Sequence, residues 1–281
     1  MSVILVIGSM NFDITYQVDA FPIPHSKTRA TAMWTGPGGS AANTAYLLAR
    51  AGACVRMVGC VGDDPFGTES LKSLASVDVD IDFVARHQSE PTSICTIIVG
   101  DGDKRMLTGP GAARRLELDQ VEAAILSGVS HIHLAAQDEA QIVHAIELAK
   151  TAGATTSLEW NGRDHRSLPC SPDLGFMNSD ELARLSPGED PVQLAKRLTS
   201  TSGGMLAVTA GAAGAFVVQG DVLVHASMPR HVDLVDRTGG GDAFDAGFLL
   251  RWTQGAPIQA CLTEGLGLAC EMLETKGTRP I

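Results

Sequence analysis

The sequence of 281 residues predicts an α/β protein built on a doubly wound, mainly parallel sheet. Short apolar runs rich in β-branched residues recur along the chain, and stretches with helical periodicity stand between several of them. Runs without polar alternation are typical of strands buried on both faces, and the intervening helices would cover those faces. The apolar runs comprise residues 3–7, 55–61, 94–99, 131–134, 206–209, 215–218 and 232–235. The helical stretches include residues 41–51, 120–126, 139–152 and 192–199.

Two segments break this alternation. Residues 14–34 are mixed in character and contain two prolines, and residues 91–107 resemble a hairpin that turns at residues 100–103. Neither segment has helical periodicity. We therefore expect a small β-sheet lid, formed by about residues 12–34 and 91–108, over one end of the main sheet. The sequence has no repeat or obvious linker, so residues 1–281 are expected to form a single domain.

The composition excludes several classes of protein. The chain has 21 Lys and Arg against 32 Asp and Glu, and a formal net charge of −11, with no basic cluster longer than a pair. A nucleic-acid partner is therefore not expected. The 6 cysteines are scattered without a C-x-x-C motif, which is typical of reduced, apolar cysteines. No apolar stretch approaches the roughly 20 residues of a membrane span, and residues 3–7 lack the basic flank of a signal peptide. We expect a cytoplasmic protein with no membrane partner.

Two glycine-rich turns each run directly into a predicted helix. Residues 35–43 read TGPGGSAAN, and residues 236–244 read DRTGGGDAF. Glycines at a helix start let the backbone approach a ligand closely and leave N–H groups at the positive end of the helix dipole, which favours phosphate. Neither turn is a P-loop, and no G-x-G-x-x-G follows the first strand. Each turn, considered alone, could instead be a tight connection between two elements that binds no ligand.

Asp242 stands in the first turn of the helix that follows the second glycine run. A carboxylate at this position is commonly a helix-terminal charge worth under about 1 kcal/mol. Beside a phosphate site it can instead accept the proton of an acceptor hydroxyl, while the neighbouring amides stabilise a transferring phosphoryl group. The chemistry of the turn alone leaves both interpretations open.

Five motifs stand in a recognisable order along the chain. They are NFD at residues 11–13, GGSAANTAYLLARAG at 38–52, NSDE at 178–181, TAGAAG at 209–214 and TGGGDAFDAGF at 238–248. With these motifs the sequence resembles the ribokinase-like (PfkB) carbohydrate kinases over essentially its whole length. The resemblance implies an ATP-dependent kinase that uses Mg²⁺ to phosphorylate a hydroxymethyl group of a sugar or sugar-like acceptor under a small β-lid.

The resemblance also implies roles for individual residues. Asp242 would be the catalytic base, and the anion hole would consist of Gly239, Gly240 and Gly241. Acceptor hydroxyls would be held by Asn11, Asp13, Gly38, Gly39 and Asn43. The nucleotide would be bound by Asn178, Glu181, Thr209, Gly211 and Gly214, with Glu181 also serving the metal through water.

Each of these roles has a structural alternative. Asn178 and Glu181 lie three residues apart near a helix start, which is the spacing of a capping box. Gly211 and Gly214 are also suited to an ordinary turn between two strands. Asn11 follows a buried strand, where α/β proteins gather ligands and where Asn also favours turns.

Two arginines mark further features of the resemblance. Arg237 occupies a position where the family usually has a small residue, and its charge argues against the K⁺ ion that binds near this segment in related enzymes. The segment EWNGR at residues 159–163 resembles one found in fructokinase-like members, which makes Asn161 and Arg163 candidate contacts to the acceptor. An exposed loop arginine is the alternative for Arg163. Arg105, on the predicted hairpin, is not expected to close over the substrate.

Other functions remain as alternatives. Residues 38–42 narrowly miss the nucleophile motif G-x-S-x-G because Ala42 replaces the last glycine, so a serine hydrolase using Ser40 is a remote possibility. A non-catalytic sugar or nucleotide sensor on the same fold is a second alternative, suggested by Arg237. The low aromatic content of 5% favours a free sugar or sugar acid over a nucleoside as acceptor. The outer face of the lid is a candidate surface for a homodimer.

Overall fold

The computed structural model describes residues 2–100, 102–116, 123–135, 138–162 and 170–279. Within them, a 9-stranded sheet forms the centre of the molecule. Its strands are β1 Val3–Gly8, β4 Cys54–Gly62, β5 Val84–His87, β8 Val129–Ala135, β9 Thr155–Glu159, β10 Leu174–Asn178, β11 Met205–Thr209, β12 Ala215–Gln219 and β13 Val222–Ala226. They stand in the order β13-β12-β11-β10-β9-β8-β1-β4-β5, and the pairs are parallel except for β11 with β12 and β12 with β13. The predicted doubly wound, mainly parallel sheet is confirmed.

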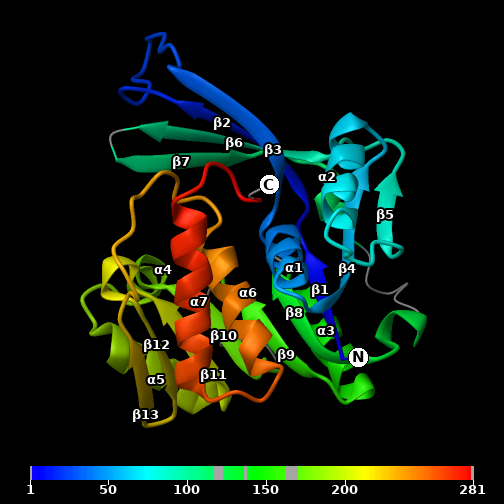
Figure 1. Ribbon diagram of the computed structural model, residues 1–281, viewed down its shortest axis with the longest axis vertical. Helices are drawn as coiled ribbons and strands as arrows, with labels where there is room; N and C mark the ends of the chain where they lie inside the picture. The colour runs from blue at the N-terminus through cyan, green and yellow to red at the C-terminus, as the bar shows by residue number, and fades with distance from the viewer. Residues whose placement is uncertain (1, 101, 117–122, 136–137, 163–169, 280–281) are drawn as a thin grey trace.

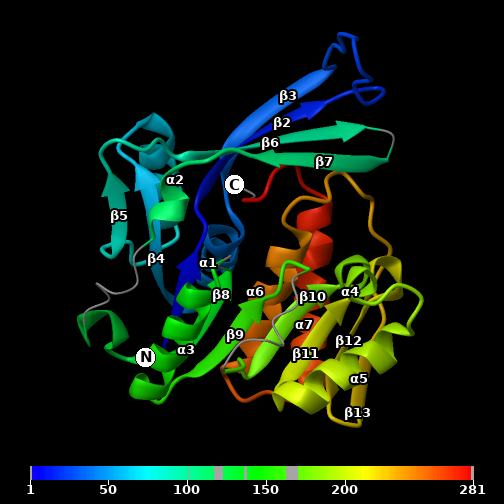
Figure 2. The same cartoon turned by 180° about the vertical axis from the view of Figure 1, so that it is seen from behind.

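Helices cover both faces of this sheet (Figures 1 and 2). One face carries α1 Ser40–Arg50, α2 Pro65–Ala75, α6 Gly240–Trp252 and α7 Ile258–Leu273, and the other carries α3 Glu139–Ala152, α4 Ser179–Leu185 and α5 Pro191–Ser202. Because side chains alternate along a strand, β1 contributes Ile4 and Val6 to the core on the first face and Leu5 and Ile7 to the core on the second. The strands therefore read as continuous apolar runs.

A smaller sheet lies across the carboxyl end of the main sheet (Figures 1 and 2). Among the described residues it has 4 strands in the order β3-β2-β6-β7. Their bounds are β2 Asn11–Gln17, β3 Ala32–Gly38, β6 Ser93–Gly100 and β7 Asp103–Thr108. Two antiparallel hairpins meet through the parallel pair of β2 and β6. The strands lie within or beside the two segments that broke the alternation in the sequence.

Two local predictions need correction. Residues 232–235 form no strand: the backbone N–H of Val235 donates to the carbonyl of Leu273 at 2.8 Å, so this apolar segment runs along the end of α7 with Leu234 and Val235 half exposed. Where a helix was expected over residues 120–126, the described part is the 3₁₀ turn η2 Ala123–Leu126. Other short 3₁₀ turns are η1 Ala112–Arg115 and η3 Gly211–Ala213.

The strand order also fixes where a ligand would bind. From β1 the chain forms β4 on one side, and it later returns to place β8 on the other side. At such a switch point the connections diverge to opposite faces and leave a crevice beyond the carboxyl ends of the strands. The small sheet stands over that crevice.

Candidate active site

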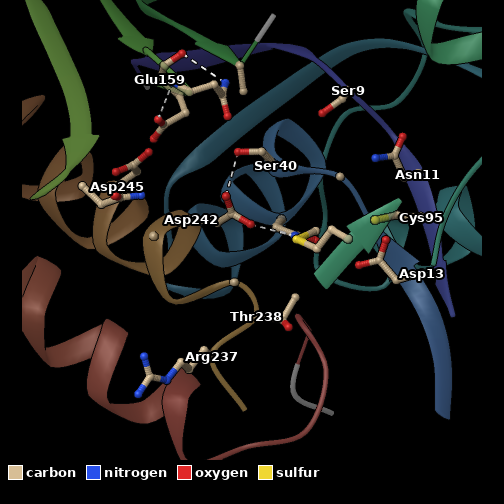
Figure 3. Close-up of a pocket in the computed structure, with 18 of the residues that line it drawn as sticks. Ser9, Asn11, Asp13, Ser40, Cys95, Glu159, Arg237, Thr238, Asp242 and Asp245 are labelled. Carbon is tan, nitrogen blue, oxygen red and sulfur yellow. Dashed lines mark hydrogen bonds between the residues drawn. The ribbon is translucent and has the colours of Figure 1, made fainter. Parts of the chain in front are cut away.

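A cavity of about 420 Å³ lies between the small sheet and the carboxyl edge of the main sheet (Figure 3). It collects predicted site residues from six separate stretches of the chain. Those that line it are Asn11, Asp13, Gly39, Asn43, Asn161, Asn178, Glu181, Thr209, Gly239, Gly241 and Asp242. Gly38, Gly240, Gly211 and Gly214 are not among the residues that line it, and Arg163 lies outside the described residues.

Asp242 is held in place by two donors from α1. The Ser40 hydroxyl donates to Asp242 Oδ1 at 2.7 Å, and the Asn43 Nδ2 group donates to Oδ2 at 2.8 Å (Figure 3). Burial raises the pKa of Asp242, while the two hydrogen bonds act in the opposite direction. The carboxylate is thus fixed in geometry and made more basic than an exposed aspartate.

The start of α6 supplies N–H groups beside this carboxylate. Gly239 is the N-cap with φ of 79°, and its carbonyl accepts the first helical hydrogen bond, from Ala243 at 2.9 Å. The amides of the first helical turn have no acceptor within the helix and stand at the positive end of its dipole. An anion in the cavity would meet them there.

Asp13 faces the same cavity from β2 in the small sheet. Gly38 on the neighbouring strand leaves room for it, because a Cβ atom at Gly38 would lie 2.2 Å from Asp13 Oδ2. Burial raises the pKa of Asp13 to about 7, although the positive charge of Arg279 opposes the shift. Gly38 therefore shapes the site without lining it.

Asn178 and Glu181 form the capping box that was the structural alternative for them. The Glu181 N–H donates to Asn178 Oδ1 at 2.9 Å, and the Asn178 N–H donates to Glu181 Oε2 at 3.0 Å. Both side chains nevertheless line the cavity. Gly211 and Gly214 flank the turn between β11 and β12, as their alternative proposed.

A second pair of carboxyl groups was not foreseen. Glu159, at the end of β9, and Asp245, in α6, face each other at the wall of the cavity (Figure 3). Asp245 is 2% exposed, and burial together with the charge of Glu159 raises its pKa well above the usual value. A single proton on such a pair relieves the repulsion between two neighbouring carboxylates. The only signal in the sequence was an aspartate inside the otherwise apolar helix AFDAGFLL.

The small sheet adds side chains that the sequence analysis did not name. Lys104, Met106 and Thr108 alternate along β7 and all line the cavity. Arg105 points the other way, and its guanidinium lies 4.1 Å from the centre of the Phe21 ring. Alternation along one strand thus separates a residue directed at the cavity from its neighbour.

The geometry disfavours a serine hydrolase. Ser40 donates its hydroxyl to Asp242, and no histidine is among the described residues that line the cavity. A serine nucleophile needs a neighbouring base to remove its proton, and a histidine usually serves. The described residues also contain no cluster of three or more His, Cys, Asp or Glu side chains arranged to hold a metal ion.

The site and fold agree with comparisons to known proteins. The model of the pfkB family carbohydrate kinases matches residues 1–281. The chain is 29% identical over 265 residues to an ATP-dependent ribose-1-phosphate kinase of Halopiger xanaduensis, covering 92% of this chain and 88% of that protein. It is 28% identical over 288 residues to a nucleoside kinase of Methanothermobacter thermautotrophicus, covering 98% and 91%. The structure of Arabidopsis thaliana ribokinase with ribose and ATP superposes with a TM-score of 0.84 at 24% identity, covering 98% of this chain and 93% of that one.

The chain belongs to the pfkB family of carbohydrate kinases. Its relatives are ribokinase-type sugar and nucleoside kinases, and it is accordingly a kinase that phosphorylates a sugar-like substrate with ATP. None of the helices in the described ranges is long and apolar enough to cross a membrane.

Proposed function

We propose that the protein transfers the γ-phosphoryl group of ATP to a hydroxymethyl group of a sugar-like acceptor, with Asp242 as the general base. One observation carries the proposal: a carboxylate fixed by Ser40 and Asn43 stands inside the cavity beside the amides at the start of α6. A base and an anion site placed together suit phosphoryl transfer, which depends mainly on positioning and electrostatics.

In the proposed reaction, the acceptor hydroxyl gives its proton to Asp242 as its oxygen bonds to the γ-phosphorus. The bond from that phosphorus to the bridging oxygen breaks, and ADP leaves. The amides of Gly239, Gly240 and Gly241 stabilise the charge on the transferring group. The raised pKa of Asp242 favours its acceptance of the proton.

We place the nucleotide on the β11 side of the cavity. Thr209, Asn178 and Glu181 line this side, and Gly211 and Gly214 shape the adjoining turn. Mg²⁺ bound with ATP would neutralise phosphate charge, and the oxygen ligands available here suit it because Mg²⁺ keeps several waters and needs only one or two carboxylates. Glu181 would serve the metal through water.

We propose that the reaction needs no K⁺. Arg237 lines the cavity, and its guanidinium extends away from Asp242 (Figure 3). A fixed positive charge in the loop before α6 opposes a cation nearby. Replacing KCl with a tetramethylammonium salt should leave kcat within about twofold, and a large loss of activity would contradict this part of the proposal.

The acceptor would lie between Asp13 and Asp242, with Asn11, Gly39 and Asn43 around it. A second cavity of about 440 Å³ shares Ser9, Asn11, Thr108 and Ala135 with the first. Asp242 is not among the described residues that line it. An acceptor whose hydroxymethyl group reaches Asp242 therefore has room to extend at its other end.

This second cavity favours a second acceptor class beside free sugars and sugar acids. Arg114, Asp138 and Gln141 are among its polar lining residues. They suit an acceptor with a polar substituent opposite the reacting hydroxymethyl group, as in the nucleosides and ribose 1-phosphate for which two relatives are named. Ala113→Trp would fill this cavity. It should abolish turnover of such acceptors and spare free ribose.

The decisive experiment measures ADP release with wild type and Asp242→Asn over pentoses, hexoses, keto-sugar acids, nucleosides and ribose 1-phosphate. We expect one acceptor class to stimulate ADP release, and the variant to lose at least about 10³-fold in kcat because its amide cannot take the proton. Ligand binding without turnover in the wild type would favour the sensor. Undiminished transfer by Asp242→Asn would exclude this residue as the base.

We also propose that the small sheet is a lid and that its outer face forms a homodimer. Residues that alternate with the cavity-lining ones point outward, and Leu107 is 72% and Met33 59% exposed. Large apolar side chains gathered on one face mark an association surface. Light scattering should give a dimeric mass for wild type and a monomeric mass for Leu107→Asp. A wild-type protein with a monomeric mass would contradict the proposed homodimer.

We also place the enzyme in the cytoplasm, where ATP is available.

A further inference from the structure

The chain returns to the active site after its last helix. Residues 274–279, which we call the C-terminal strap, run from the end of α7 to the space beneath the small sheet, beside β3 and α1 (Figure 1). The N–H of Gly277 donates to the buried Asp236 carboxylate at 3.2 Å, and the Thr278 hydroxyl donates to the Pro37 carbonyl at 3.1 Å. The strap therefore ties the loop before α6 to the strand that ends at Gly38.

Arg279 ends the described part of the strap and donates to three separate elements. Its Nη2 group donates to the Gly38 carbonyl at 3.1 Å, and its Nη1 group donates to the Ser73 hydroxyl of α2 at 3.1 Å. Its Nε group donates to Asn43 Oδ1 at 3.2 Å. The guanidinium also lies 5.8 Å from the centre of the Tyr46 ring. A planar fork with this many fixed partners has one orientation.

The contact with Asn43 determines which way that amide faces. An asparagine side chain accepts through its oxygen and donates through its nitrogen, so its two ends are not interchangeable. Arg279 is only a donor, and it therefore requires the oxygen of Asn43 on its side. The NH₂ group is left to face Asp242 Oδ2 at 2.8 Å, as observed. Arg279 thereby fixes a donor against the proposed base without touching that base.

We propose that Arg279 is a positioning residue that holds Asp242 ready for proton transfer through Asn43, and that the C-terminal strap is thus a working part of the active site. The proposal rests on the proposed function, in which Asp242 is the base. Neither the motifs nor the resemblance to the family assigned a role to this residue.

The charge of Arg279 acts on the same site. Burial lowers its pKa to about 10, so it remains a cation at neutral pH. Its charge lowers the pKa of both Asp13 and Asp242. Other charged groups act on these two carboxyls: Lys104 on the lid lowers both pKa values, and Asp236 raises that of Asp13. The charge of Asp242 in turn raises the pKa of Glu159 on β9 and of Asp245 on α6. Removing Arg279 takes away one of the cations that lower the pKa of both Asp13 and Asp242.

The test compares Arg279→Gln and Arg279→Lys with wild type in steady-state kinetics across pH, using the best acceptor. For Arg279→Gln we expect kcat to fall about 10- to 100-fold, the acid limb of the kcat profile to move to higher pH, and KM for ATP to stay within about twofold. Arg279→Lys keeps the positive charge but lacks the planar guanidinium that donates to three elements. Its acid limb should lie at the wild-type pH, whereas its kcat should stay below that of wild type.

Arg230→Gln is the matched control, because Arg230 pairs with Glu274 at the start of the same strap but lies on the surface, away from the cavity. It should leave both kcat and the pH profile unchanged. If Arg279→Gln does not fold, two milder variants test the same contacts: Ser73→Ala removes one hydrogen bond of the guanidinium, and Arg279→Lys keeps the charge. Each should lower kcat with little change in Tm.

The outcomes separate the two proposals. A wild type without kinase activity would refute the proposed function. An active wild type for which Arg279→Gln keeps kcat within about threefold and keeps the acid limb would refute the role of Arg279 alone. Equal losses in Arg230→Gln and Arg279→Gln would show that the strap acts only through stability.

Discussion

At the scale of single residues, the site is dominated by carboxyl groups that the fold removes partly or, at Asp245, almost fully from water. Burial is the largest cause of the raised pKa of Asp13, Asp242, Glu159 and Asp245. Removing a carboxylate from water favours its protonated form unless donors or cations compensate. Asp242 has two donors, whereas Asp245 Oδ2 has no hydrogen-bond partner among the described residues. The same burial thus acts on a carboxylate with two fixed donors at Asp242, the proposed base, and on a carboxyl oxygen without a donor at Asp245.

The Glu159–Asp245 pair predicts a change of stability with pH. The folded protein binds the shared proton more tightly than the unfolded chain, so stability is lost as pH rises from the unfolded pKa near 4 through the raised folded value. In Asp245→Asn, the side-chain amide can donate an N–H to Glu159 at any pH, so the contact no longer depends on a titratable proton. It should raise Tm at pH 8.5 by about 2–4 °C, which corresponds to roughly 1 kcal/mol, and give no gain at pH 4.5.

Thermal unfolding of the ligand-free protein at both pH values measures this effect. Asp221→Asn, in the exposed turn between β12 and β13, is the control and should show no pH-dependent gain. An Asp245→Asn variant that is equally or less stable at pH 8.5 would show that the pair carries no shared proton.

At the scale of elements, the position of Asp242 depends on how closely α6 packs against α7. The two helices meet at glycines: a Cβ atom at Gly247 would lie 2.6 Å from the Glu264 carbonyl oxygen, and one at Gly265 would lie 2.8 Å from the Phe244 carbonyl oxygen. Both obstacles are backbone atoms, which cannot move aside independently of their helix. The glycines therefore set the distance at which α6 is held.

Gly247→Ala should destabilise the fold by about 1–3 kcal/mol, because overpacking forces the two helices apart. It should also lower kcat, since α6 carries Asp242. Gly267→Ala on α7 is the matched control: nothing lies within 4 Å of its added Cβ, and alanine is favoured over glycine in a helix by about 0.5–1 kcal/mol. Urea denaturation measures both changes. Equal stability of the two variants would contradict this account of the α6–α7 contact.

The elements that the sequence predicted are those with strong periodicity. Residues 3–7 and 139–152 lie within β1 and α3. The strands β9 and β10 were missed because their sequences, TTSLE and LGFMN, are interrupted by polar residues or glycine and form no continuous apolar, β-branched run. The segment 232–235 failed for the opposite reason: it is apolar, but the edge of the sheet is already taken by β13 and only the end of α7 is beside it.

The site divides in a similar way. Motif residues such as Asn43 and Asp242 were predicted because the glycine-rich turns beside them have a local signature and resemble motifs of the family. Their contact joins positions 199 residues apart, and nothing local indicates it. The Glu159–Asp245 pair and the Arg279 fork are likewise products of tertiary packing. Single residues of these kinds have no pattern that sequence can show.

At the scale of the whole molecule, a polar ladder lies inside the main sheet. His131 and His133 on β8 are fully buried, and both bond the Ser157 hydroxyl on β9 at 2.8 Å. His131 also bonds the Thr155 hydroxyl at 2.9 Å. Because these strands lie in the middle of the sheet, a protonated histidine in the ladder cannot be hydrated unless the fold opens. Protonation of the ladder is therefore coupled to global unfolding.

This coupling predicts acid destabilisation. Burial lowers the pKa of each histidine from 6.5 to about 3, so the unfolded chain takes up protons that the folded protein refuses. Stability contributed by the neutral ladder is present above pH 6.5 and is lost as pH falls towards 3. At pH 5 each histidine lowers the free energy of unfolding by about 2 kcal/mol.

The variant His133→Leu removes one of the two histidines and leaves Ser157 its bond to His131. Between pH 7 and pH 5 its free energy of unfolding should therefore fall by about 2 kcal/mol less than that of wild type. His231→Gln, on the surface, should follow wild type. Urea denaturation at pH 7, 6 and 5 distinguishes these outcomes, and the comparison between variants cancels the opposing effect of the buried carboxyls. Parallel pH dependences for His133→Leu and wild type would show that the buried ladder takes up protons without unfolding.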